Sequence, residues 1–116
     1  MQSVFRQGDV LVKRTRRTPS AHATLVTDQG RTILAYGEVT GHAHQVVEDV
    51  PIPEDNRDPV PAMQLFQEPD GSRILVVARP ASLIHEEHSR IALAPANYEV
   101  IRQREYHPEA IRNVAD

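Results

Sequence analysis

Tight-turn sequences recur along this chain, with short runs rich in β-branched residues between them. Residues 9–16 contain the run Val-Leu-Val and are preceded by Gly8, which predicts a strand that is entered from a tight turn. Residues 24–27 and 31–36 are two further β-rich runs, and the tripeptide Asp-Gln-Gly separates them. Because Gly30 can supply the positive φ that a short loop needs, these two runs predict a hairpin.

The later part of the chain repeats this pattern. Residues 63–67 and 73–78 flank the sequence Glu-Pro-Asp-Gly-Ser, which predicts a second hairpin with Asp-Gly at its tip. Residues 97–106 form the longest late strand candidate, after a Pro-Ala-Asn turn. Many short strands with regularly spaced turns predict an all-β fold, either a small β-barrel or a β-sandwich.

Two segments depart from the strand pattern. Residues 49–61, DVPIPEDNRDPVP, carry four prolines and four acids, so they predict a mobile loop. This loop could cover a site as a lid, although a tolerated surface insertion is the simpler interpretation. Residues 108–115 are the helical candidate, because Pro108 suits a first helical position and Ile111 and Val114 share a face.

Size and composition narrow the class of protein. A chain of 116 residues predicts a single domain over residues 1–116, and 40% hydrophobic residues are enough for a core. No run approaches the length of a membrane helix, and the first ten residues do not resemble a secretory signal. We therefore expect a cytoplasmic protein without a membrane partner. The absence of cysteine excludes disulfides and thiolate metal sites.

The charge balance argues against a general nucleic-acid binder. The formal net charge is −3, whereas such proteins are usually strongly basic. Arg14, Arg16 and Arg17 form one basic cluster, but a solvated strand or loop explains it more simply. A nucleic-acid accessory role is therefore the least favoured hypothesis.

Four of the six histidines fall in two close pairs. His42 and His44 are two residues apart, so on a strand they project to the same side, roughly 6.6 Å apart. His85 and His88 are three apart, and only a turn would place both on one side. If the pairs meet, four imidazoles can hold one metal ion. The alternative is four solvated histidines.

The chemistry of such a site depends on how many ligands it uses. With imidazole and carboxylate donors only, Zn, Fe, Mn, Ni and Cu are candidates, and we take zinc as the default. Four histidines would close the shell of a structural site, whereas three would leave room for water and catalysis. Glu86 and Glu87 lie between the second pair and are candidates for a catalytic base or a partner of a ligand, with plain solvent exposure as the alternative.

Two resemblances extend this interpretation. Residues 37–48, GEVTGHAHQVVE, resemble the first metal motif of cupins, in which HxH is followed by a glutamate. His42, His44 and Glu48 match that motif, so the resemblance implies that they bind a metal in a cupin-like fold. The stretches GDVLV, EVTGHAH, HEEH and RQREYHPEAIRNVAD are similar to a group of small bacterial and phage-encoded proteins with paired histidine motifs.

Two main functional hypotheses follow. The first is a metal-binding β protein that catalyses hydrolysis or oxidation of a small-molecule ligand. The second is a non-enzymatic structural, assembly or interaction protein, phage-derived by its resemblance, in which the histidines fix the fold or a subunit interface. Exposed sheet edges in so short a chain also favour a homo-oligomer.

Overall fold

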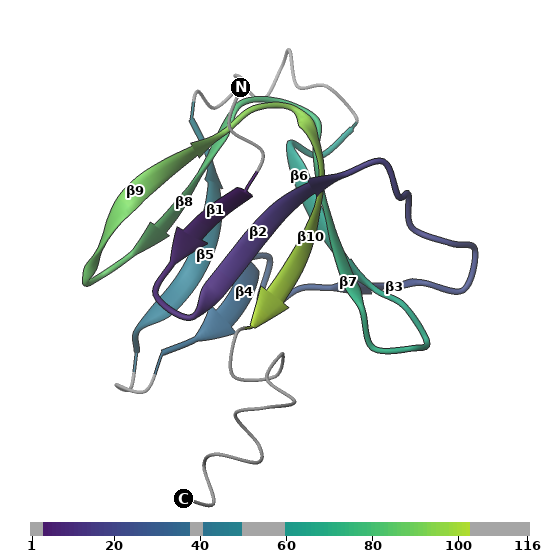
Figure 1. Cartoon of the computed structure of the whole chain (residues 1–116), viewed down its shortest axis with the longest axis horizontal. Coiled ribbons are helices and arrows are strands. Elements are labelled where there is room, and N and C mark those ends of the chain that lie inside the picture. The colour runs from purple at the N-terminus through teal and green to yellow at the C-terminus, as the bar shows by residue number, and fades with distance from the viewer. Residues whose placement is uncertain (1–3, 38–40, 50–59, 103–116) are drawn as a thin grey trace, which may run out of the picture.

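Ten strands form two antiparallel sheets in the computed structural model, which describes residues 4–37, 41–49 and 60–102 (Figure 1). The first sheet has the order β1 (Val4–Gln7), β2 (Val10–Thr15), β10 (Ala96–Arg102), β7 (Arg73–Val77), β6 (Met63–Gln67) and β3 (Thr24–Val26). The second has the order β4 (Thr32–Tyr36), β5 (Ala43–Glu48), β8 (Ala81–His85) and β9 (His88–Leu93). The all-β prediction is confirmed.

The inner faces of the two sheets share one core. In β2, Val10 and Val12 are fully buried and Lys13 is exposed, which is the alternation expected of a strand with one buried face. Leu83 of β8 belongs to the same hydrophobic cluster from the other sheet. Tyr98 of β10 is also buried there, and its hydroxyl donates to the carbonyl oxygen of Ala94 at 2.6 Å.

In the described ranges the two sheets do not close into a barrel. The edge strands β1 and β9 approach each other, but they belong to separate sheets (Figure 1). A side chain spans the gap instead of a strand ladder, because the amide nitrogen of Gln7 donates to the carbonyl oxygens of Leu83 at 3.0 Å and Ser89 at 2.9 Å. The barrel alternative is therefore wrong for this part of the chain, and two packed sheets describe it.

The first predicted hairpin is correct in its turn and wrong in its strands. Gln29 and Gly30 both have positive φ, 53° and 81°, and Asp28 and Arg31 exchange two backbone hydrogen bonds. Beyond that bridge the strands separate, since β3 pairs with β6 and β4 pairs with β5. The reason lies in burial: β4 buries three successive residues in the second sheet, whereas β3 is short and mostly exposed.

The other turn and strand predictions fare better. β6 and β7 pair around the Asp-Gly turn, where Gly71 has φ 93°, so the second hairpin is confirmed. The predicted helix at residues 108–115 and residues 50–59 of the predicted loop lie outside the described residues. None of the described segments forms a helix long and apolar enough to cross a membrane.

Candidate metal centre

A tight hairpin brings the second histidine pair together. His85 ends β8, His88 begins β9, and Glu86 and Glu87 form the turn between them. His85 and His88 are register partners across this turn, and their ring centroids lie 4.7 Å apart. The structure thus contains the turn that a spacing of three required, and both side chains point to the same side.

The first histidine pair comes from the neighbouring strand. Gln45 of β5 pairs with Ile84 of β8, so one further step along this register sets His44 beside His85. The centroids of the His44 and His85 rings lie 4.3 Å apart, and the His42 ring, just before β5, lies 5.8 Å from His85. Three imidazole rings therefore lie around that of His85, and we call the four residues the histidine cluster: His42, His44, His85 and His88.

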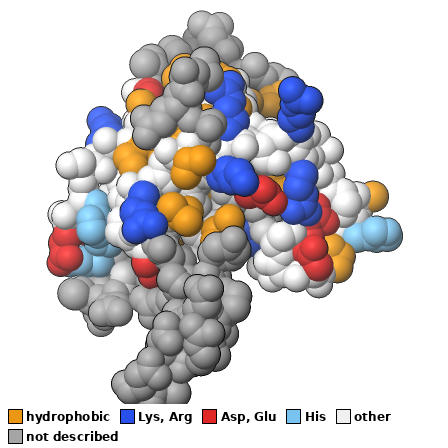
Figure 2. Space-filling model, in the orientation of Figure 1, with side chains coloured by type: hydrophobic (Ala, Val, Ile, Leu, Met, Phe, Trp, Pro, Cys, Tyr) orange, Lys and Arg blue, Asp and Glu red, His pale blue; other side chains and the backbone are white. Residues whose placement is uncertain are grey.

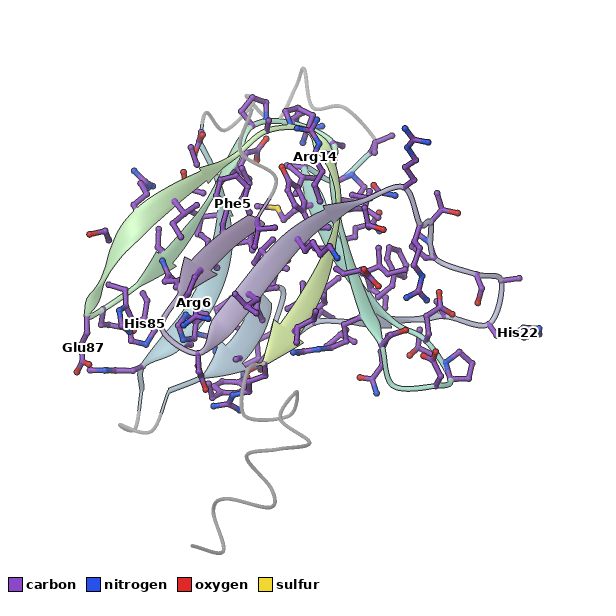
Figure 3. All side chains as sticks on the ribbon, in the orientation of Figure 1. Phe5, Arg6, Arg14, His22, His85 and Glu87 are labelled. Carbon is purple, nitrogen blue, oxygen red and sulfur yellow. The ribbon has the colours of Figure 1, made fainter. Side chains whose placement is uncertain are left out.

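The cluster lies at one edge of the molecule. Figure 2 shows histidine and acidic side chains side by side at the lower left of the face, and one separate histidine at the opposite edge. In Figure 3, His85 and Glu87 are labelled at the lower left and His22 at the right. The exposed His22 is therefore far from the cluster.

Three side chains of this region have donor atoms close enough for one metal ion. His42, His85 and Glu86 each offer a ligand atom within 4.8 Å of those of the other two, and we call them the metal triad. The Glu86 side chain accepts a hydrogen bond from the amide nitrogen of Ala43 at 3.0 Å. This bond is the main cause that lowers the pKa of Glu86, so the side chain is an ionised carboxylate at neutral pH.

Glu87 orients both histidines of the metal triad. Its carboxylate lies 3.3 Å from Nδ1 of His42, where a carboxylate can orient the imidazole of a metal ligand. Its backbone amide donates to Nδ1 of His85 at 3.0 Å, so the proton of a neutral His85 ring lies on Nε2. A metal ion that binds His85 through Nδ1 must therefore displace the amide of Glu87. An ion that binds through Nε2 must displace the proton on that nitrogen.

Gln7 fixes the protonation of His44 in the same way. Both amide hydrogens of Gln7 go to backbone carbonyls, so its side-chain oxygen faces Nδ1 of His44, 2.8 Å away. An amide oxygen only accepts, hence Nδ1 of His44 is protonated and Nε2 has the lone pair. Burial, followed by the charge of His85, lowers the pKa of His44 to about 4, so the ring is neutral at pH 7.

Two glycines let the backbone approach the imidazoles. A Cβ at Gly8 would lie 2.9 Å from Nε2 of His88 and 3.2 Å from Cε1 of His44. A Cβ at Gly37 would lie 3.1 Å from Cβ of His42 and 3.3 Å from Nε2 of His85. Real Cβ atoms essentially never come as close as the contact at Gly8, and the contacts at Gly37 are tighter than most, so a side chain at either position would press on the imidazoles.

Some sequence candidates lie elsewhere. Glu48, which the cupin resemblance pairs with His42 and His44, is at the far end of β5, where it accepts from Nε of Arg79 at 3.1 Å. The Glu48 position thus departs from the cupin ligand set.

The sequence predicted the tight turn at Gly8, between β1 and β2, but not that this turn lies beside the histidine cluster. Gln7, Gly8 and Asp9 all contact or border the cluster, and Nε2 of His44 lies 3.8 Å from an Asp9 carboxylate oxygen. The short sequence Gln-Gly-Asp signals a turn, but it contains no metal motif. The turn lies beside the histidines because the edge strands β1 and β9 of the two sheets face each other.

Comparison with known proteins identifies the family of the chain but suggests no activity for it. Residues 6–103 match the family model described as "Domain of unknown function (DUF8820)". No curated protein and no solved structure matches the chain. The geometry of the site is therefore what indicates a function.

Proposed function

The chain belongs to the DUF8820 family, and from the geometry of its histidine cluster we propose that it binds a divalent metal ion, zinc by preference, through His42, His85 and Glu86. The observation that supports this proposal most strongly is that the three donors lie within 4.8 Å of one another, although one precedes β5 and the other two belong to the β8–β9 hairpin.

The donor set and its surroundings support this proposal. Two imidazoles and one carboxylate form a ligand set used by zinc and by non-haem iron, and the chain has no thiolate to compete. Glu87 next to Nδ1 of His42 is the carboxylate partner that metal-bound histidines commonly have. Glu86 is ionised at neutral pH, as a metal ligand must be.

The same geometry favours a reactive ion over a closed structural one. Three protein ligands leave one position of a tetrahedral ion for water or a small molecule. Glu86 and Glu87 are both exposed and His42 is only partly buried, so a small ligand can reach the ion. Metal-dependent hydrolysis or oxidation of a small molecule is the activity class that we propose, with Glu87 as the carboxylate available to take up a proton.

One observation favours the non-enzymatic alternative. The triad joins the residue before β5 to the β8–β9 turn, so a bound ion would cross-link two loops and stabilise the fold. A protein of this kind would use the ion for folding or for assembly. Thermal unfolding with and without a chelator separates the two, because a structural ion raises Tm strongly.

Metal analysis of the purified protein tests the proposal. After expression in zinc-supplemented medium, we expect at least one zinc ion per chain by elemental analysis. The substitutions His42→Ala and Glu86→Gln each remove a ligand and should weaken zinc binding at least tenfold in a chelator competition assay. His22→Ala is the matched control, because it removes an exposed histidine far from the cluster. Protein that binds no zinc, or binds it equally well in all three variants, would contradict the proposal.

A further inference from the structure

We infer that the chain has a second binding site, for a small apolar amino acid, in a pocket at the end of the two-sheet fold opposite the histidine cluster. The pocket has a volume of about 390 Å³, and Phe5, Leu93 and Tyr98 form part of its wall. Among the described residues that line it, Arg14 and Asp49 carry charge. The inference is independent of the proposed metal site, because the two sites share no residue.

The strands place the pocket and the histidine cluster at opposite ends. His88 begins β9 and Leu93 ends it, so about 17 Å of extended strand separates the two sites. Figure 1 shows β9 climbing from the β8–β9 turn to the top of the view, where it leads into β10. In Figure 3, Phe5 and Arg14 are labelled in the upper part of the view and His85 at the lower left. A ligand in the pocket therefore lies away from the metal triad.

Aromatic and aliphatic side chains form the body of the pocket. The Phe5 and Tyr98 rings meet edge to face, with centroids 6.3 Å apart. Tyr98 is fixed, because its ring is buried and its hydroxyl donates to the carbonyl oxygen of Ala94 at 2.6 Å. Ala94 and Pro95, which link β9 to β10, also line the pocket. Apolar walls with a few polar groups, around a volume of about 300 Å³ or more, are typical of small-molecule sites.

Arg14 brings a positive charge to the inner side of its strand. It follows Val10 and Val12 at two-residue intervals, and both of these are fully buried in the core. Its register partner is Tyr98 of β10, so the two side chains lie on the same face of the sheet. Burial raises the pKa of Tyr98, and the charge of Arg14 partly offsets that rise, as expected of a guanidinium near the phenol. With five N–H donors, the guanidinium can bind a carboxylate in addition to its contacts within the protein.

Asp49 brings a negative charge to the same pocket from the other sheet. It directly follows β5, and its backbone amide donates to the carbonyl oxygen of Pro80 at 3.2 Å. Its Oδ1 accepts a hydrogen bond from the hydroxyl of the buried Ser82 at 2.6 Å, which holds the carboxylate in place. A carboxylate has about four acceptor positions, so this bond leaves others for a ligand.

An apolar amino acid matches all of these groups. Its carboxylate pairs with the Arg14 guanidinium, its ammonium group pairs with the Asp49 carboxylate, and its side chain lies between the apolar walls. A ligand with a negative charge alone would be repelled by Asp49, and one with a positive charge alone by Arg14. The pocket therefore favours a ligand that carries both charges, and free leucine or phenylalanine is small enough for it.

Binding of phenylalanine tests the inference. Isotope-labelled protein, first treated with a chelator, is titrated with phenylalanine and followed by NMR. We expect saturable shifts of the Leu93 and Ala94 amides, little change at the Glu87 amide, and a dissociation constant of about 0.1–5 mM, the range for a ligand of this size. Phenylpropanoate, which lacks the ammonium group, and phenylethylamine, which lacks the carboxylate, should each bind at least about tenfold more weakly.

Variants assign the binding to the two charges. Arg14→Met and Asp49→Asn should each weaken phenylalanine binding at least about tenfold, with an intact fold by circular dichroism. Arg16→Met is the matched control, because Arg16 is exposed just after β2, and this variant should bind phenylalanine as the unaltered protein does. The inference is overturned by the absence of a saturable shift in the unaltered protein, or by shifts confined to residues away from the pocket. Equal binding of phenylpropanoate, or of phenylalanine by either folded charge variant, overturns it as well.

Discussion

The side-chain oxygen of Gln7 accepts a hydrogen bond from Nδ1 of His44 across 2.8 Å, and this contact links the edge of one sheet to the histidine cluster of the other. Gln7 also donates to Leu83 and Ser89, so one amide both bridges the two sheets and sets a histidine tautomer. Packing of the sheets and preparation of the site thus depend on the same side chain.

Replacement of Gln7 by leucine should therefore change both stability and metal binding. The variant leaves three buried or partly buried polar groups without their partner, so we expect a loss of about 1–3 kcal/mol in the free energy of unfolding. Zinc should bind the metal triad up to about tenfold more weakly, because His44 loses the group that orients its ring and this ring lies 4.3 Å from the ring of His85. Urea unfolding and zinc titration measure the two effects.

Gln67→Leu is the control for this change, since Gln67 is exposed at the end of β6. It should leave zinc binding unchanged. Nitrogen NMR of the histidine rings gives a further check, because Nδ1 of His44 should be the protonated nitrogen at pH 7. A ring protonated on Nε2 would show that Gln7 does not set the tautomer.

The histidine cluster could be predicted from sequence because its geometry is local. The two-residue spacing of His42 and His44 and the hairpin that joins His85 to His88 are each decided within a few residues. Strand alternation and turn chemistry operate at that range. That these two pairs would meet was a hypothesis, and it depended on β5 pairing with β8.

The rest of the site depends on which sheet edges face each other, and no local pattern encodes that. Gln7 and Asp9 reach the cluster because β1 lies against β9, although more than thirty residues separate them from His44 in the chain. The same limit explains the first hairpin, where the turn at Gly30 was predictable but the separation of β3 from β4 was not.

Gly8 should tolerate alanine less well than glycines of similar conformation. Gly8→Ala places a Cβ 2.9 Å from Nε2 of His88, in addition to the strain of a side chain at φ 60°. Gly30→Ala carries the strain alone, since φ is 81° and nothing lies within 4 Å of the added Cβ. We expect both to lose about 1–2 kcal/mol of stability from the backbone conformation. Only Gly8→Ala should also weaken zinc binding, and equal zinc affinities in the two variants would contradict the crowded site.

The stability of the metal-free protein should fall as the pH is lowered from about 6.5 to about 4. Burial lowers the pKa of His44 to about 4 in the folded state, whereas the unfolded chain takes up this proton near the ordinary value of 6.5. Between these values the unfolded state binds more protons, so stability rises with pH across the window and is fully present above it. The contribution of this one group is at most about 3 kcal/mol at neutral pH.

Urea unfolding of chelator-treated protein at several pH values measures this dependence. His44→Gln has no titrating group at this position, so its stability should change less across the same window. Equal slopes for the two proteins would mean that His44 does not titrate as its burial implies.

Zinc binding should change the backbone amide of Glu87. That amide donates to Nδ1 of His85 at 3.0 Å, so an ion at His85 either takes this nitrogen from the amide or removes the proton from the other side of the ring. Both events alter the hydrogen bond, and we expect a large shift of the Glu87 amide signal in a zinc titration followed by NMR.

The amide of Gly71 is the matched control, because it donates to the carbonyl oxygen of Glu68 at 2.9 Å in a hairpin turn of the other sheet. Since Gly71 contacts no ligand, its signal should stay in place. An unchanged Glu87 amide at full zinc loading would exclude His85 from the ligand set.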